Sequence, residues 1–312
     1  MKAAVVTLTL NPAVDRTVAV DGWVPGGTNR ATVLRVDPGG KGLNVARVTR
    51  RLGLETWALG LVGEENAALF HRMLAREGIR DALLEVPGET RLNLKILDRQ
   101  RGLETEVNET GFAVPPEALE RLERRLEEVW SHCAALILAG SLPPGVPDTY
   151  YADLVRRARA AGLLVVLDAS GEPLRHGLAA GPGAVKPNRP ELEEVAGGPL
   201  RDLAAVRQAA ASLRRAGAGW VLVSLGAEGA LLCGEQGAWH ASPPPGPVGS
   251  TVGAGDAMVA ALVHGLLSGF DPERILRRAV AAGTATARRP GTELCTAEEI
   301  ESLEPAVQVR AL

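Results

Sequence analysis

ALILAGSLPPGVPDTYYADLVRRARAAGLLVVLDAS, residues 135–170, contains the pattern that decides the fold of this chain. Its two ends, 135–141 and 163–170, are near-continuous apolar runs that predict strands buried on both faces. The segment between them, 148–161, predicts a helix. Two strands of one sheet that are joined through a helix run parallel to each other, so the stretch predicts a unit of a parallel sheet.

Strand and helix alternate along the rest of the chain. AAVVTLTL (3–10), TWALGLVG (56–63) and WVLVSLG (220–226) predict further strands, and the glycines that close the predicted helices 41–53 and 66–78 are typical of helix ends. The sequence therefore predicts an α/β fold, a doubly wound, mostly parallel sheet flanked by helices. Further helices are predicted at 116–131, 189–196, 201–216, 254–268, 272–287 and 297–303, and a short hairpin at 229–241.

Two stretches interrupt this alternation. Residues 12–36 and 89–111 have the period of two that is typical of strands, and no helix within them. They predict a small β-sheet that stands off the main domain as a lid. Because no linker or internal repeat is present, we expect a single domain over 1–312, with PPPGP (243–247) as a rigid loop.

The composition excludes several classes of protein. The net charge is −3 over 312 residues, which argues against nucleic acid or an anionic membrane as the main partner. No apolar run reaches the roughly 18 residues of a membrane span, and the N-terminal stretch becomes polar too soon for a signal peptide, so a cytoplasmic protein is expected. Three cysteines without a C-x-x-C pair predict reduced thiols.

Lysine is rare in this chain. Of 34 basic residues only four are lysines, at positions 2, 41, 95 and 186, which leaves thirty arginines. A lysine that persists against such a bias is a candidate for a site that needs a compact ammonium group. Ligands of doubly wound sheets bind at the carboxyl ends of the strands; the polar or glycine residues that follow the predicted strands there are Asn11, Asp15, Ser141, Asp168 and Gly226.

STVGAGDAMVAALVHGLL (250–267) is the sharpest functional signal. Gly253 and Gly255 let backbone N–H groups at a helix start approach an anion, and the helix dipole adds positive potential there. Asp256 follows in the first turn. An aspartate in that position can simply complement the dipole, but beside an anion hole it indicates a base aimed at a hydroxyl group. Phosphoryl transfer needs this combination of alignment and charge neutralisation.

A second glycine-rich helix entry, DPGGKGLNVARV (37–48), places Lys41 and Asn44 on one face. It lacks the spacing of a dinucleotide fingerprint or a P-loop, so a ligand loop and a plain turn with a helix cap both fit. In TRLNLK (90–95), alternation puts Arg91, Asn93 and Lys95 on one face of a strand. Two cations and an amide suit a sugar phosphate, but an exposed charged edge strand fits equally.

VKPNRPELEE (185–194) places Lys186 and Asn188 at a strand end and Glu191 one turn into the following helix. The carboxylate and the amide can hold Mg²⁺ through water molecules, because Mg²⁺ keeps much of its hydration shell. An ordinary capping box, with Asn188 and Glu191 three residues apart, predicts the same spacing.

Together these segments resemble the ribokinase-like (pfkB) family of carbohydrate kinases over nearly the whole chain. GGKGLNVARV (39–48) and STVGAGDAMVAAL (250–262) are similar to its two signatures. Between them stand AGSLPPGVP (139–147), the N-x-x-E element at 188–191, and VSLGAEGALL (223–232). TLTLNPAVD (7–15), TRLNLK and GSLPPG are similar to the phosphosugar branch of the family.

The resemblance implies Mg-ATP as donor, a small-molecule phosphosugar as acceptor, and a homodimer formed through the lids. It also implies an anion hole over 253–256 with Asp256 as the catalytic base and Glu191 as a ligand of Mg²⁺ through water. By matching motif positions, the catalytic set is Gly253, Ala254, Gly255 and Asp256; the phosphosugar set is Asp15, Gly39, Gly40, Lys41, Asn44, Arg91, Asn93 and Lys95; the ATP set is Lys186, Asn188, Ser224, Gly226, Gly229 and Thr251.

Two groups of motifs bear on which sugar-phosphate isomer is the substrate, and they point to different isomers. GGKG, TRLNLK and TEVNETGF (105–112) resemble the 1-phosphofructokinases, which implies conversion of fructose 1-phosphate to fructose 1,6-bisphosphate. The tail AAGTATARRPGTELC (281–295) and the PPPGP loop resemble the minor 6-phosphofructokinases, which carry glycine where Lys41 stands. A kinase for fructose 6-phosphate or tagatose 6-phosphate is therefore the alternative. A catalytically silent sugar-phosphate sensor is the alternative from another class of protein.

Overall fold

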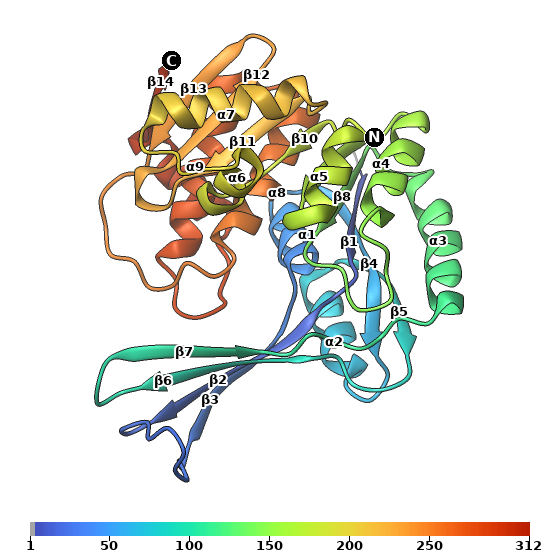
Figure 1. Cartoon of the computed structure of the whole chain (residues 1–312), viewed down its shortest axis with the longest axis vertical. Coiled ribbons are helices and arrows are strands. Elements are labelled where there is room, and N and C mark those ends of the chain that lie inside the picture. The colour runs from blue at the N-terminus through green and yellow to red at the C-terminus, as the bar shows by residue number, and fades with distance from the viewer. Residues whose placement is uncertain (1–3) are drawn as a thin grey trace.

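The computed structural model describes residues 4–312 of the chain, and it has the predicted α/β architecture (Figure 1). A ten-stranded sheet runs in the order β14-β13-β12-β11-β10-β9-β8-β1-β4-β5. The seven strands from β11 to β5 are parallel to their neighbours, and the remaining three pairs are antiparallel. The strands are β1 Ala4–Thr9, β4 Glu55–Gly63, β5 Arg80–Val86, β8 Ala135–Ala139, β9 Leu164–Asp168, β10 Ala184–Val185, β11 Trp220–Ser224, β12 Ala230–Gly234, β13 Gly237–Ser242 and β14 Gln308–Ala311.

The stretch 135–170 forms the predicted strand–helix–strand unit. Its two strands, β8 and β9, pair in parallel from Ala135 opposite Leu164 to Ala139 opposite Asp168, and helix α4 connects them. All five residues of β8 are buried, as a strand covered on both faces requires. The register brings the end of β8 next to Asp168, at the edge of the sheet where ligands bind in such folds.

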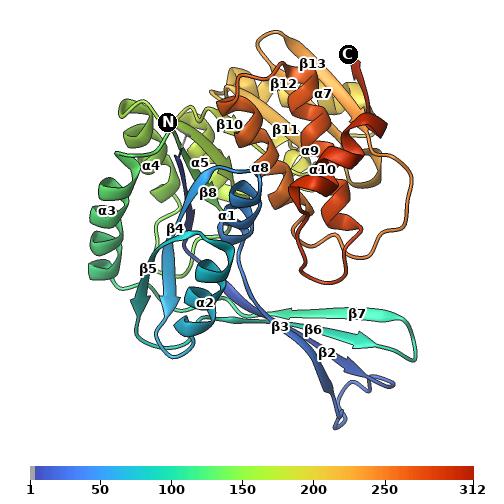
Figure 2. The same cartoon turned by 180° about the vertical axis from the view of Figure 1, so that it is seen from behind.

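Helices cover both faces of the large sheet (Figures 1 and 2). Val5 and Val6 are neighbours in β1 but belong to different core clusters, because successive side chains of a strand point to opposite faces. The core cluster that contains Val6 includes residues of α3, α4, α5, α6 and α7, whereas the cluster that contains Val5 includes residues of α1, α8, α9 and α10. The helices are α1 Lys41–Arg51, α2 Ala67–Glu77, α3 Pro116–Trp130, α4 Tyr150–Ala160, α5 Gly171–Ala179, α6 Arg189–Ala196, α7 Leu203–Arg215, α8 Ala254–Leu267, α9 Pro272–Ala287 and α10 Ala297–Leu303.

The two stretches that interrupt the alternation form a separate four-stranded sheet, as predicted. Its order is β3-β2-β6-β7, and Figures 1 and 2 show it projecting from the main body. The strands β2 and β6 are parallel, and the outer two pairs are antiparallel. The strands are β2 Ala13–Val20, β3 Thr32–Gly39, β6 Leu92–Asp98 and β7 Leu103–Asn108. β3 runs directly into α1, so the small sheet and the first glycine-rich segment are continuous.

The structure also contains elements that the sequence patterns did not predict: β5, α5 and β14. The strand end expected before Lys186 is that of β10, which has only two residues. The predicted strand 3–10 is present as β1, except that residue 3 lies outside the described part of the chain. Over residues 4–312, no helix is long and apolar enough to cross a membrane.

Candidate active site

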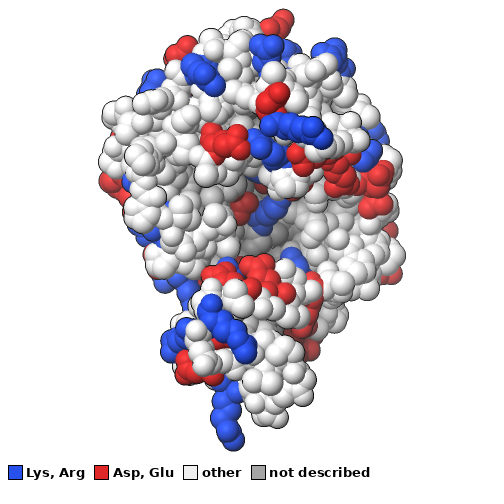
Figure 3. Space-filling model, turned by 60° about the vertical axis from the view of Figure 1, so that its left-hand side comes forward, with Lys and Arg blue, Asp and Glu red and all other residues white. Residues whose placement is uncertain are grey.

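A cavity of about 1260 Å³ lies between the large sheet and the small sheet. Figure 3 looks into this hollow, where charged side chains are visible below the main body. Residues of both glycine-rich segments line it, namely Gly40, Lys41 and Asn44 from the first and 251–256 from the second. The fold therefore brings together two motifs that are about two hundred residues apart in the sequence.

The second glycine-rich segment forms the start of α8. Gly253 caps the helix in the left-handed conformation with φ 78°, and a side chain there would collide with Leu294. The backbone N–H groups of Gly255 and Asp256 have no acceptor among residues 4–312. They point out of the first turn, where the helix dipole is positive. The start of α8 thus offers two open N–H donors at the place where the sequence predicts an anion hole.

Asp256 lies in that first turn and is buried. Its Oδ2 accepts a hydrogen bond from Asn44 Nδ2 at 2.9 Å. Burial, and then the nearby carboxylate of Asp168, raise the pKa of Asp256 to about 6, against the opposing effects of Asn44, Lys41 and Lys186. A carboxylate with a pKa near neutrality is suited to general base catalysis.

Asp168, at the end of β9, is the buried counter-ion of two lysines. Its Oδ1 lies 3.2 Å from Lys41 Nζ and 3.4 Å from Lys186 Nζ, and its Oδ2 has no hydrogen-bond partner within the described residues. Burial alone would raise the pKa of Asp168, but the ammonium groups of Lys186 and Lys41 hold it below its usual value. Sequence reasoning singled out the position of Asp168 but gave it no role; the available signal was an aspartate at the carboxyl end of a predicted strand.

Lys41 shares the carboxylate of Asp168 with Lys186. Its ammonium group is 3.2 Å from Asp168 Oδ1 and 4.0 Å from Glu191 Oε1, and Asp168 also holds Lys186. Burial lowers the pKa of Lys41, but Asp168 and Glu191 raise it by more, so the group is charged at neutral pH. The structure thus groups Lys41 with the lysine predicted for ATP.

Glu191 and Asn188 form a complete capping box at the start of α6. Glu191 Oε2 accepts from the Asn188 backbone N–H at 2.8 Å, and Asn188 Oδ1 accepts from the Glu191 backbone N–H at 2.8 Å. Glu191 Oε1 remains without a hydrogen bond and faces Lys41. Over residues 4–312, no group of three or more His, Cys, Asp or Glu side chains is placed to hold a metal directly.

The small sheet supplies the other end of the cavity. Asp15 of β2 lies opposite Asn93 of β6, and Asn93 Nδ2 donates to Asp15 Oδ1 at 2.9 Å. Arg91 Nη1 donates to Asn93 Oδ1 at 3.1 Å. Gly39 does not line the cavity; a side chain at Gly39 would collide with Asp15, so this glycine admits the carboxylate.

Lys95 lies further out on β6. Its ammonium group pairs with Glu104 at 3.0 Å and with Glu106 at 3.3 Å, both on β7. Although Lys95 lines the cavity, its charge is already compensated there. Of the three side chains predicted to share one face of this strand, Arg91 and Asn93 are in contact, and Lys95 bonds elsewhere.

The remaining predicted residues line the opposite end of the cavity: Lys186, Asn188, Ser224, Gly226, Gly229, Ala254 and Thr251. Asn188 and Ser224 pair as an isolated parallel bridge, which sets the two strand ends side by side. Sequence reasoning missed the wall that α9 contributes here, formed by Val280, Gly283, Thr284 and Ala287. Together with the 243–248 loop, this wall is largely apolar.

Comparison with known proteins agrees with this geometry. Residues 2–299 match the family described as pfkB family carbohydrate kinase. The chain is 41% identical over 313 residues to a 1-phosphofructokinase of Rhodobacter capsulatus, covering 100% of this chain and 99% of that protein.

Two solved structures are similar in fold. Phosphofructokinase-2 of Escherichia coli, in complex with substrates and products, has a TM-score of 0.91 and 34% identity, covering 97% of this chain and 98% of that chain. Arabidopsis thaliana ribokinase complexed with ribose and ATP has a TM-score of 0.81 and 23% identity over 97% of this chain and 99% of that chain, which shows the fold alone. With the family match over most of the chain and a relative above 30% identity over its whole length, the chain belongs to the pfkB family of carbohydrate kinases, which are phosphotransferases.

Proposed function

We propose that the protein transfers a phosphoryl group from Mg-ATP to fructose 1-phosphate and forms fructose 1,6-bisphosphate. The observation that carries this proposal is the position of Asp256. Its carboxylate is buried, bonded to Asn44, and placed in the turn whose N–H groups are free to bind an anion. A sensor that binds a sugar phosphate without turnover has no use for such a base.

In this proposal, Asp256 accepts the proton of the substrate hydroxyl while the hydroxyl oxygen attacks the terminal phosphorus of ATP. The free N–H groups of Gly255 and Asp256 then bind the oxygens of the transferred group. Lys41 and Lys186 add two positive charges beside Asp256, both held by Asp168. We infer that Lys41 binds the transferred phosphoryl group. The reason is that its ammonium group pairs with the carboxylate of Asp168, which also pairs with Lys186.

ATP is assigned to the end of the cavity lined by the predicted ATP set. Lys186 lies next to the proposed anion hole. A Cβ atom at Gly255 would be 3.3 Å from Lys186 Nζ. The apolar wall of α9 accommodates the base. Bound Mg²⁺ would neutralise charge on the phosphates, and Glu191 Oε1 is the carboxylate oxygen left to orient its water shell.

The phosphosugar is assigned to the small-sheet end, where Asp15 would accept from sugar hydroxyls. Arg91 and Asn93 would bind the phosphate that the sugar already carries, which requires Arg91 to exchange donors that now go to the backbone carbonyls of 11, 12 and 109. The sequence relatives named 1-phosphofructokinase, such as that of R. capsulatus, support fructose 1-phosphate. The structural likeness to E. coli phosphofructokinase-2, which has also been solved in complex with fructose 6-phosphate, supports that sugar as the second candidate.

Product analysis tests the proposal. With fructose 1-phosphate and Mg-ATP, ³¹P NMR should show a new phosphate monoester on carbon 6 together with ADP. The variant Asp256→Asn, as matched control, should form this product at a small fraction of the rate. A protein that binds the sugar phosphate but forms no ADP would be the sensor instead.

We further propose that the small sheet acts as a lid and pairs with that of a second copy. Val33 is 56% exposed and Leu103 59%, and Leu34, Val36 and Val107 are exposed beside them. An exposed apolar group on a small projecting sheet is typical of an interaction surface. Analytical ultracentrifugation should give a dimer that Val33→Asp weakens; a wild-type monomer at micromolar concentration would refute this assembly.

A further inference from the structure

A second cavity, of about 520 Å³, lies on the other side of the segment that connects α9 to α10. Thr292 of that segment lines the main cavity, and Glu293 lines the second one. Five arginines from four parts of the fold surround it: Arg35 of β3, Arg47 and Arg51 of α1, Arg76 of α2, and Arg289 after α9. We name this cavity the arginine pocket.

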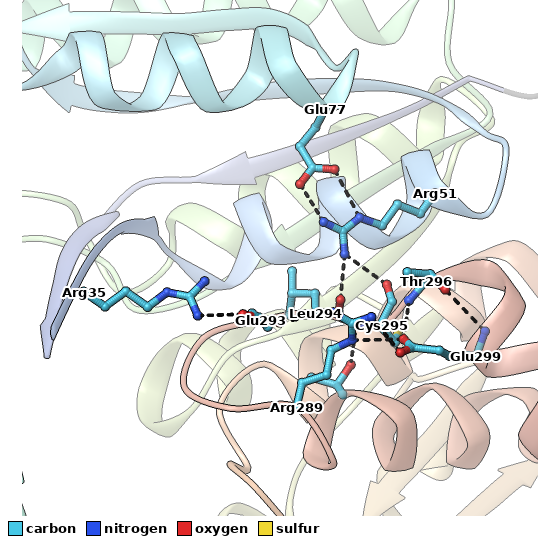
Figure 4. A network of polar contacts seen from close by, with 10 residues as sticks. Arg35, Arg51, Glu77, Arg289, Glu293, Leu294, Cys295, Thr296 and Glu299 are labelled. Carbon is cyan, nitrogen blue, oxygen red and sulfur yellow. Dashed lines mark hydrogen bonds and ion pairs between the residues drawn. The ribbon is translucent and has the colours of Figure 1, made fainter.

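Two of these arginines are fully engaged, as Figure 4 shows. Arg51 donates Nε and Nη2 to Glu77 at 3.1 and 2.6 Å, and Nη1 to the carbonyls of Leu294 and Cys295. Arg289 donates Nε and Nη2 to Glu299 at 3.0 and 2.6 Å, and Nη1 to Glu293 at 3.2 Å. Because all their nitrogens are used, Arg51 and Arg289 fix the walls of the pocket.

Arg47 is different. Its side chain is only 10% exposed, and its one hydrogen bond runs from Nε to Glu77 Oε1 at 3.2 Å. Its two Nη nitrogens have no partner among residues 4–312, and the side chain lines the pocket. Arg47 and Arg51 also share the single carboxylate of Glu77. The two Nη nitrogens of Arg47 are not enclosed by protein atoms, so they can donate to a ligand or to water in the pocket.

Arg76 supplies a second open guanidinium group. It is exposed at the rim of the pocket and forms no ion pair with the described residues. Arg35 is partly used, because it pairs with Asp37 and donates Nη1 to Glu293 at 3.2 Å. The lining carboxylates are Glu293, which is bonded to Arg35 and Arg289, and Glu298. The donors still open to a ligand therefore come chiefly from Arg47 and Arg76.

We propose that the arginine pocket binds a small phosphorylated metabolite that is separate from the two substrates of the main cavity. Planar guanidinium groups bind phosphate oxygens through paired N–H donors, which matches the two open nitrogens of Arg47. A volume of about 520 Å³ exceeds what a lone phosphate fills and is in the range of small-molecule sites.

The position of the pocket couples it to the lid. Arg35 belongs to β3, and its partner Asp37 accepts a hydrogen bond from Thr292 Oγ1 at 2.8 Å, across the wall between the two cavities. An anion that draws Arg35 toward the pocket weakens its contact with Glu293 and shifts β3 relative to the main body. Occupancy of the pocket is thus expected to change the Michaelis constant of the main site.

Calorimetric titration of the full chain with inorganic pyrophosphate tests the site without reference to catalysis. The wild type should show one binding event in the arginine pocket and a separate one at the anion hole of the main cavity. Lys186→Ala should lose the event in the main cavity, whereas Arg47→Gln and Arg76→Ala should weaken the other event at least about tenfold, the loss of one charge-assisted contact. Arg72→Ala, an exposed arginine on the same helix that does not line the pocket, is the matched control.

Arg76→Ala removes a side chain without protein partners, so it leaves the fold intact even if Arg47→Gln does not. A single binding event in the wild type overturns the proposal. An equal loss of pyrophosphate affinity in Arg72→Ala and Arg76→Ala would also overturn the proposal, because it would mean that the ion binds to general surface charge. A failure of the proposed sugar kinase activity would leave the two-event titration unchanged, so the two ideas fail separately.

Discussion

Asn44 Nδ2 and Asp256 Oδ2 lie 2.9 Å apart, and this hydrogen bond joins α1 to α8 across 212 residues of sequence. Each residue comes from one of the two glycine-rich segments. The contact means that the segment following the small sheet orients the carboxylate next to the anion hole. It also stabilises the ionised form of Asp256 and so opposes the effect of burial on its pKa.

The pH dependence of the reaction should report this carboxylate. Asp256 must be ionised to accept a proton, and its pKa is raised to about 6, so kcat/KM should fall as the pH drops through that value. Asn44→Ala removes a bond that favours the ionised form, so the midpoint of the acid limb should move to higher pH. Identical midpoints in the variant and the wild type would assign the acid limb to another group.

Asp256→Asn removes the base itself. We expect kcat to fall by about 10²–10⁴-fold, the usual effect of removing a general base, while ATP binding changes little. Asp271→Asn is the control, because Asp271 caps α9 and asparagine can cap as well. Stopped-time assays and ATP titrations check both variants; near-normal turnover in Asp256→Asn would remove this residue from the mechanism.

Glu191→Gln separates the two roles of Glu191. Glutamine can still accept the hydrogen bond from the Asn188 backbone, but it lacks the charge that orients a hydrated cation. The Mg²⁺ concentration for half-maximal rate should therefore rise more than the Michaelis constant of the sugar, with little change in the melting temperature. An unchanged metal titration together with a lower melting temperature would leave Glu191 as a helix cap only.

Arg91 and Lys41 should affect different kinetic constants. A charge-assisted hydrogen bond contributes about 1.5–3 kcal/mol, so Arg91→Ala should weaken phosphosugar binding by about one to two orders of magnitude. Free fructose should be handled as poorly as before. Lys41→Ala should act mainly on kcat, because Lys41 lies with Lys186 at Asp168.

Lys95→Ala is the matched control for Arg91→Ala on the same strand. Its charge is already paired with Glu104 and Glu106, so the Michaelis constant should change less. If Lys41→Ala raises the Michaelis constant for the phosphosugar and leaves kcat unchanged, Lys41 binds the substrate phosphate after all.

The large sheet could be predicted from sequence because its strands are apolar runs between amphipathic helices. β8, with all five residues buried, is the clearest example. The strand β5 was missed because RDALLEV has charged residues at positions that face solvent near the sheet edge. The strand end before Lys186 was expected, and β10 there has only two residues, which pair with β9 and β11. Helix α5 was missed because it contains glycine and proline, which weaken a helical pattern.

The motif residues could be predicted, but their grouping could not. Lys41 and Asp168 are 127 residues apart, and nothing in either motif indicates that they form an ion pair. The same holds for Arg47 and Arg51, whose spacing is typical of an ordinary exposed helix face; only the docking of α2 and the segment before α10 encloses them. Long-range placement of charged side chains requires the tertiary structure.

The most direct test of the proposed function is a coupled assay of ADP release that compares kcat/KM for fructose 1-phosphate, fructose 6-phosphate and tagatose 6-phosphate with Mg-ATP. The proposal predicts the highest value for fructose 1-phosphate, and Asp256→Asn should lower the rate with all three sugars. A clear preference for fructose 6-phosphate would contradict the assignment and would show that the tail at 281–295 was the better guide to the substrate.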